Sequence, residues 1–216
     1  MPELHLNGHM NQAMFSSTSQ ALHFAFMIQA YEVSVENIMS KAIRAIMKEL
    51  GIWNEGEPST VDFSGLSPLE IRGQCAMIRA IVRDRLPGPE AWAIQARYGV
   101  NEITMIDGKK RFVFSLERQE AIMNLGDWMA PSFPNFNPLA VDILIAKAVG
   151  ALNKKQSNGI TFREMAEQFG LSHGAYHHAM KQVGERLIAL EGRAIDTLMP
   201  EFERDGVVLC VSTLCN

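Results

Sequence analysis

The chain has 216 residues, a size that suits one sizeable domain or two to three small ones, each with its own hydrophobic interior. Hydrophobic residues make up 47% and charged residues 20% of the sequence, which is ordinary for a globular protein. The formal net charge is −4, which excludes histone-like binding through bulk positive charge. Any contact with nucleic acid must therefore come from a local patch.

Cysteine content and the N-terminal sequence bear on the compartment. Cys75, Cys210 and Cys215 are too few for a disulfide framework and leave at least one thiol unpaired, which suits a reducing compartment. The N-terminus lacks a basic segment followed by an apolar core. The most apolar stretch, residues 21–30, is far shorter than the roughly 20 residues that a membrane span needs. We therefore expect a cytoplasmic protein without membrane contact.

The first predicted region, residues 1–51, combines a loose arm with a helical hairpin. Residues 19–32 are apolar on nearly every side, which predicts a helix covered by its neighbours. Residues 34–50 repeat apolar side chains at steps of three and four, and Gly51 follows at the C-cap position. This apolar stripe is interpreted either as core packing or as a surface for self-association.

The middle region is predicted over residues 67–126, after a linker rich in Gly, Ser and Pro. Ser67 and Glu70 have the spacing of a capping box, which predicts that a helix starts here. That helix should end before the Pro87-Gly88 pair, and a short helix should follow over 89–98.

One β-hairpin is expected to interrupt the helices. Residues 103–106 and 109–114 flank Asp107-Gly108, a sequence typical of a two-residue hairpin turn. Ser115 is placed to cap the next helix, which we expect to end at Gly126.

The C-terminal region is predicted over residues 137–200. Asn137 and the proline after it should open a helix that runs to about Asn153. A second apolar stripe, over 183–198, lies in a helix expected to reach Pro200. This stripe can either pack on the 137–153 helix or pair with a second copy of the chain.

Two short helices joined by a turn lie within this region. Thr161 and Glu164 form a second capping-box pattern at the start of the first helix. Gly170 should end that helix, Leu171 is expected to be buried in the turn, and Ser172 should cap the second helix.

The segment from Phe162 to Lys181 resembles the helix-turn-helix of bacterial DNA-binding proteins. The small residue of the family's first helix falls on Ala166, and the turn glycine falls on Gly170. The apolar support positions fall on Met165, Phe169, Leu171, Tyr176 and Ala179. Tyr176 departs from the branched aliphatic residue usual in the family, which bears on the angle between the two helices.

The second helix and the residues after it also look like the DNA-reading region at the end of bacterial sigma factors and related phage regulators. The resemblance implies a sequence-specific, DNA-binding transcription regulator of bacterial or phage origin. On the motif's geometry, the side chains that face base edges are Ser172, His173, Gly174, His177, His178 and Lys181. Those that lie toward the phosphate backbone are Lys154, Lys155 and Arg163.

Local charge favours this interpretation over a merely solvated polar face. Residues 154–182 hold four lysines and arginines against two acids, a balance of +2 within a chain of −4. A second basic cluster on the middle helix, and the tip of the hairpin, can also touch nucleic acid or simply face water. The cluster and tip comprise Arg72, Arg79, Arg83 and Arg85, and Lys109, Lys110 and Arg111.

Several kinds of chemistry have no motif in the sequence. Phosphate-binding loops, dinucleotide-binding glycines, a nucleophile elbow and the HExxH zinc motif are all missing. We therefore expect no enzyme activity, no cofactor and no metal. The sequence predicts a mainly α, multi-helix protein with one β-hairpin and a C-terminal helix-turn-helix, binding double-stranded DNA as a homodimer. Two alternatives stay open: a phage-type antiterminator that binds RNA polymerase, and a protein–protein adaptor or inhibitor built on a helix-turn-helix scaffold.

Overall fold

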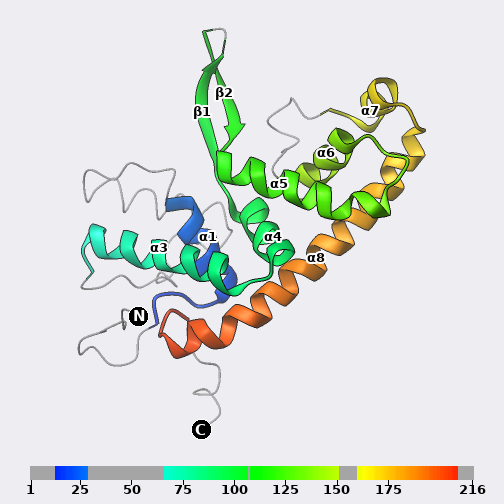
Figure 1. The fold of residues 1–216 in the computed structure, drawn as a ribbon. Coiled ribbons are helices and arrows are strands. Elements are labelled where there is room, and N and C mark those ends of the chain that lie inside the picture. The colour runs from blue at the N-terminus through cyan, green and yellow to red at the C-terminus, as the bar shows by residue number, and fades with distance from the viewer. Residues whose placement is uncertain (1–12, 29–65, 107, 151–159, 209–216) are drawn as a thin grey trace, which may run out of the picture. The chain divides into compact units, whose positions relative to one another are not determined.

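The computed structural model describes residues 13–28, 66–106, 108–150 and 160–208 (Figure 1). Within them the protein is mainly α-helical with one two-stranded antiparallel sheet, which confirms the predicted fold class. The chain divides into two compact units, one made of the residues up to Arg85 and from Ile195 onward, the other of Leu86–Ala194. The predicted 34–50 helix, Lys154, Lys155, Cys210 and Cys215 lie outside the described residues.

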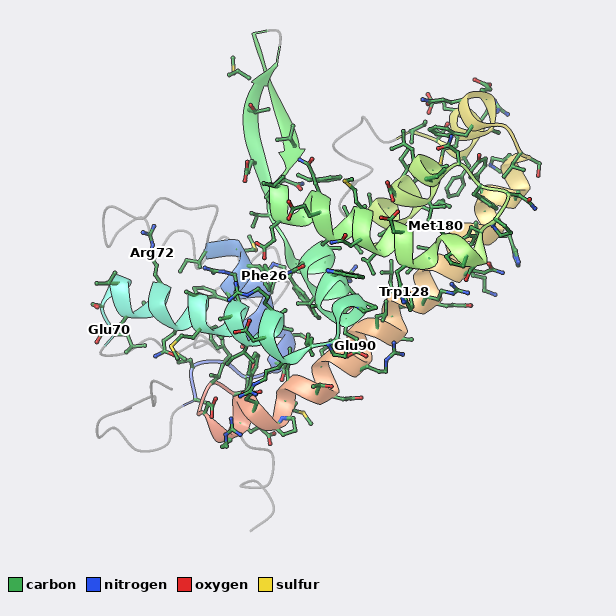
Figure 2. All side chains as sticks on the ribbon, in the orientation of Figure 1. Phe26, Glu70, Arg72, Glu90, Trp128 and Met180 are labelled. Atoms are coloured by element: carbon green, nitrogen blue, oxygen red, sulfur yellow. The ribbon has the colours of Figure 1, made fainter. Side chains whose placement is uncertain are left out.

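The first unit packs α1 (Thr18–Met27) against α3 (Pro68–Arg85). Phe24 and Phe26 on α1 are buried (Figure 2). The Arg79 guanidinium of α3 donates to the carbonyl oxygen of Ala25 over 2.5 Å. Helices leave their last carbonyls without an internal partner, so this contact satisfies the end of α1.

The start of α3 confirms the predicted capping box. The Glu70 carboxylate accepts hydrogen bonds from the backbone amide and the hydroxyl of Ser67, both over 2.7 Å. The Ser67 hydroxyl in turn accepts from the Glu70 amide over 3.3 Å. These bonds lower the pKa of Glu70, because they favour its charged form. Figure 2 shows Glu70 and Arg72 in this N-terminal part of α3.

The second unit follows the predicted order of helix, hairpin and helices. Its elements are α4 (Gly88–Tyr98), β1 (Asn101–Ile106), β2 (Lys109–Phe114), α5 (Leu116–Met129), the 3₁₀ turn η2 (Ala130–Ser132), α6 (Pro138–Ala148), α7 (Phe162–Phe169) and α8 (His173–Arg204) as far as Ala194. Its core is a single cluster of buried side chains drawn from α4, α5, α6, α7 and α8.

The β-hairpin has the predicted turn, with Ile106 paired to Lys109 and Gly108 at φ 70°. It extends away from α4 and α5 (Figure 1). Its base is fixed by Arg118, which is 6% exposed and donates to the Ala96 carbonyl and to the Asn101 side chain, each over 2.9 Å. Burial lowers the pKa of Arg118 to about 10, with a smaller contribution from Arg97.

The prediction that Gly126 ends a helix is wrong, because α5 continues through it to Met129. Gly126 is buried, and the Asp142 carboxylate of α6 lies where a Cβ at this position would stand. The glycine therefore serves the close packing of α5 on α6 rather than a helix end.

Two further helix ends differ from expectation. α6 ends at Ala148 rather than near Asn153, since Gly150 turns the chain at φ 73° and its amide donates to the Lys147 carbonyl. α8 passes Pro200 and ends at Arg204.

The 183–198 stripe of α8 is buried within the chain itself. Val183, Leu190 and Leu198 are each at most 1% exposed. Val183 and Leu190 join the core cluster that includes the α6 side chains. Of the two predicted roles, packing inside the chain is therefore the one the structure supports, and the role of dimer seam is wrong for this stripe.

Candidate nucleic-acid interface

α7 begins at the predicted capping box. The Thr161 hydroxyl accepts from the Glu164 amide over 3.2 Å, and the Glu164 carboxylate accepts from the Thr161 amide over 2.6 Å. Hydrogen bonds from the backbone and the side chain of Thr161 to the Glu164 carboxylate lower its pKa, because they favour the charged form. The carboxylate is exposed and caps the start of its own helix.

The turn between α7 and α8 has two residues of positive φ, Gly170 at 75° and Leu171 at 64°. The Ser172 hydroxyl accepts from the Ala175 amide over 3.2 Å, which confirms Ser172 as the cap of α8. The prediction that Leu171 is buried is wrong, since its side chain is 42% exposed.

Tyr176 is buried beside the turn and is bonded to it. Its ring is 0% exposed and meets Phe136 edge to face, with 5.4 Å between centroids. Its hydroxyl donates to the Gly170 carbonyl over 2.9 Å. The tyrosine therefore joins α8 to the turn through a partly buried hydrogen bond, while its ring packs in the core.

The predicted base-facing residues lie together on one exposed surface, which we call the reading face. It comprises the exposed residues Ser172, His173, Gly174, His177, His178 and Lys181. Arg163, predicted at the phosphate backbone, is exposed on α7. Lys154 and Lys155, the other two residues predicted at the phosphate backbone, lie outside the described residues.

The structure adds Lys147, which the helix-turn-helix pattern does not contain. Its ammonium group lies 5.6 Å from the centre of the Phe162 ring and donates to the Ile160 carbonyl over 2.7 Å. The same ring meets His173 and His177, each with 6.1 Å between centroids. One aromatic ring at the start of α7 thus gathers three basic side chains from α6 and α8. Sequence reasoning missed Lys147 because nothing in its neighbourhood connects it to the motif.

Charges on the reading face are partly matched within the chain. Lys181 lies 3.9 Å from Glu185, and the His178 ring nitrogen lies 3.1 Å from the Gln182 side-chain amide. Over 160–182 the two strong bases, Arg163 and Lys181, are balanced by Glu164 and Glu167. The predicted excess of +2 therefore depends on Lys154 and Lys155.

The second basic cluster has other partners. Arg79 donates to the end of α1, and Arg83 lies 3.1 Å from Asp84. The side chains of Lys109, Lys110 and Arg111 at the hairpin tip are not among those described. Two histidines of the reading face, by contrast, lie against the Phe162 ring beside Lys147.

Among the described residues, no group of three or more His, Cys, Asp or Glu side chains is arranged to hold a metal ion. In the same part of the chain, no helix combines the length and the apolar character needed to cross a membrane. No family model matches the chain, and a search of curated proteins finds no match.

Proposed function

We propose that this protein binds double-stranded DNA in a sequence-specific way and regulates transcription in a bacterium or a phage, using the helix that starts after Ser172. We further propose that it acts in the cytoplasm as a homodimer and without catalytic activity. The observation that carries the proposal is the reading face, a row of exposed polar side chains on a helix held by a two-residue turn.

The local packing supports a rigid reading face. The capping box, the Ser172 cap and the Tyr176 hydroxyl each fix a part of the α7–α8 pair that would otherwise be free to move. A reading helix must keep its orientation when side chains meet base edges, because misplacement loses hydrogen bonds. Lys147, near Phe162, adds a base suited to a phosphate contact.

The direct test is selection of bound fragments from the host genome, followed by gel shifts with the fragments recovered. We expect saturable retention of a shared sequence over unrelated DNA at the same salt concentration. Retention that is equal on all sequences and disappears uniformly with rising salt would leave only non-specific binding and contradict the proposal.

Two variants connect the binding to the reading face. His177→Ala should lower the preference for the selected sequence, whereas Arg163→Ala should weaken binding to all sequences through a lost phosphate contact. Arg204→Ala is the matched control, because Arg204 lies at the other end of α8 and pairs with Glu201 and Asp205. Exposed pairs contribute little to stability, so the control should bind DNA like the wild type.

A protein-binding role, as an adaptor or as a polymerase-binding antiterminator, is the second candidate. It is favoured by large apolar side chains exposed on α5, namely Leu116 at 68%, Met123 at 59% and Trp128 at 44%. Trp128 is marked in Figure 2. Binding to purified RNA polymerase in a pull-down, lost in Met123→Asp while gel shifts are unchanged, would support this role. Gel shifts lost in His177→Ala would support the first.

A further inference from the structure

A small pocket lies within the second unit, between α4, the end of α6 and α8. Its volume is about 220 Å³. The walls are mainly apolar, with Ala148 from α6 and Met180 and Ile188 from α8 among the lining residues. Ile188 is 72% exposed, an unusual state for a large aliphatic side chain beside a cavity. Figure 2 marks Met180 on the N-terminal part of α8.

Two opposite charges line the same pocket. The guanidinium of Arg97 on α4 lies 3.9 Å from the Glu191 carboxylate on α8. This distance is within the range of an ion pair but longer than that of a direct charge-assisted hydrogen bond. The other Glu191 oxygen accepts from the Tyr98 hydroxyl over 2.8 Å, which holds the carboxylate in place. The pocket therefore presents one positive and one negative group beside an apolar wall.

Its size and charges select a class of ligand. Sites for drug-sized molecules occupy roughly 300–1,000 Å³, so this pocket suits a smaller molecule of about ten non-hydrogen atoms or fewer. The ligand needs a carboxylate for Arg97, an ammonium group for Glu191 and a branched apolar tail for the wall. An aliphatic α-amino acid has all three.

The backbone of α8 is open where it lines the pocket. A Cβ added at Gly184 would meet nothing within 4 Å, so no packing contact requires glycine there. Glycine inside a helix costs about 1 kcal/mol relative to alanine. A larger side chain at this position would project into the pocket space.

We propose that this pocket is a binding site for a free aliphatic α-amino acid, with the carboxylate on Arg97, the ammonium group on Glu191 and the side chain against Ile188 and Met180.

Calorimetric titration of the full-length protein with L-leucine tests the proposal without DNA, so its outcome is independent of the DNA-binding proposal. We expect saturable binding below about 10 mM, as suits so small a ligand. Two analogues that each lack one charge, 4-methylpentanoate and 3-methylbutylamine, should bind about tenfold more weakly or worse, because each leaves a charged partner unmatched. Glycine, which lacks the tail, should bind more weakly as well.

Variants locate the site. Gly184→Leu should fill the pocket and abolish binding, while Gly192→Leu is the matched control, since a Cβ at Gly192 also meets nothing within 4 Å and the residue does not line the pocket. Arg97→Leu should weaken L-leucine binding about tenfold and leave 3-methylbutylamine unaffected. If thermal melting shows that Gly184→Leu is unfolded, Arg97→Leu still tests the proposal.

Three results would overturn the proposal. The first is the absence of saturable heat with L-leucine. The second is binding to a folded Gly184→Leu protein as tight as to the wild type, which would place the site elsewhere. The third is equal affinity for L-leucine and both analogues, which would remove any role for the charged pair.

Discussion

At the scale of single residues, Tyr176 shows how a departure from a family pattern is accommodated. An aliphatic residue there would only fill space, whereas the phenol also reaches the Gly170 carbonyl. The bond is partly buried and Gly170 is exposed, so losing the donor should cost about 1 kcal/mol, the net contribution of an average hydrogen bond. The turn is therefore more dependent on this side chain than the motif alone suggests.

Tyr176→Phe should lower the free energy of unfolding by about 1 kcal/mol, because the ring is kept and only the hydroxyl is lost. Chemical denaturation measures the change, and gel shifts should show weaker DNA binding. Tyr98→Phe serves as the control, since its hydroxyl bonds Glu191 rather than the turn. Unchanged stability and unchanged DNA affinity in Tyr176→Phe would mean that the bond does not hold the turn.

At the scale of elements, the close approach of α5 and α6 depends on Gly126 and Asp142. Asp142 is partly buried, and its pKa is raised to about 6, first by burial and then by the nearby charge of Asp127. The carboxylate therefore opposes folding when it is ionised.

The Asp142 shift predicts a fall in stability as pH rises. The folded pKa of about 6 lies above the ordinary value of 3.8, so the folded state binds more protons between these two values. The free energy of unfolding should decrease across this window and then level off. Asp142→Asn should remove the decrease and raise stability at neutral pH by about 1–2 kcal/mol, allowing for solvent screening. Denaturation curves of both proteins at about pH 4 and about pH 7 give the two free energies of unfolding. If stability falls equally in the wild type and in Asp142→Asn, the pH effect belongs to other groups.

Gly126→Ala should destabilise the protein by about 1–2 kcal/mol, because the new methyl group displaces the Asp142 carboxylate and strains the helix pair. Gly192→Ala is the control, an open helical position where alanine should instead stabilise by up to about 1 kcal/mol. Combining Gly126→Ala with Asp142→Ala should restore the lost stability. Thermal melting of the wild type and of the three variants measures these changes. A Gly126→Ala protein as stable as the control would contradict the close-packing role.

Local chemistry made part of this architecture predictable. The capping boxes at Ser67 and Thr161 and the Asp107-Gly108 turn depend on neighbours a few residues away, so the sequence alone predicts them. The role of Gly126 was predicted wrongly, because the side chain that requires a glycine there, Asp142, belongs to another helix.

Non-local packing also explains what was missed at the candidate site. Leu171 is exposed where a buried side chain was predicted, and the approach of Lys147 to Phe162 spans 15 positions of sequence. The exposed face of α8 could be predicted from the spacing of its apolar residues, whereas the side chains around that face could be found only from the fold.

At the scale of the whole molecule, the burial of the 183–198 stripe narrows the surfaces that can form a dimer. A stripe that fills the chain's own core cannot also pair with a second copy. The remaining apolar stripe identified from sequence is the one at 34–50, outside the described residues.

We predict a homodimer whose formation requires the 34–50 stripe. Light scattering at micromolar concentration should give about twice the mass of one chain, and Ile43→Asp should give the monomer, because a charge in an apolar interface is costly. Lys41→Asp is the control, since Lys41 lies off the stripe. A wild-type protein that stays monomeric with and without DNA would contradict the prediction.

The contact between Tyr176 and Phe136 also has an evolutionary consequence. The two rings meet edge to face under the turn, so neither can shrink without leaving a void beside the other. A sequence with an aliphatic residue at 176 would need a compensating substitution at 136 and a new donor for the Gly170 carbonyl. Among related sequences, positions 136 and 176 should therefore covary, and the tyrosine should persist in lineages that keep the phenylalanine.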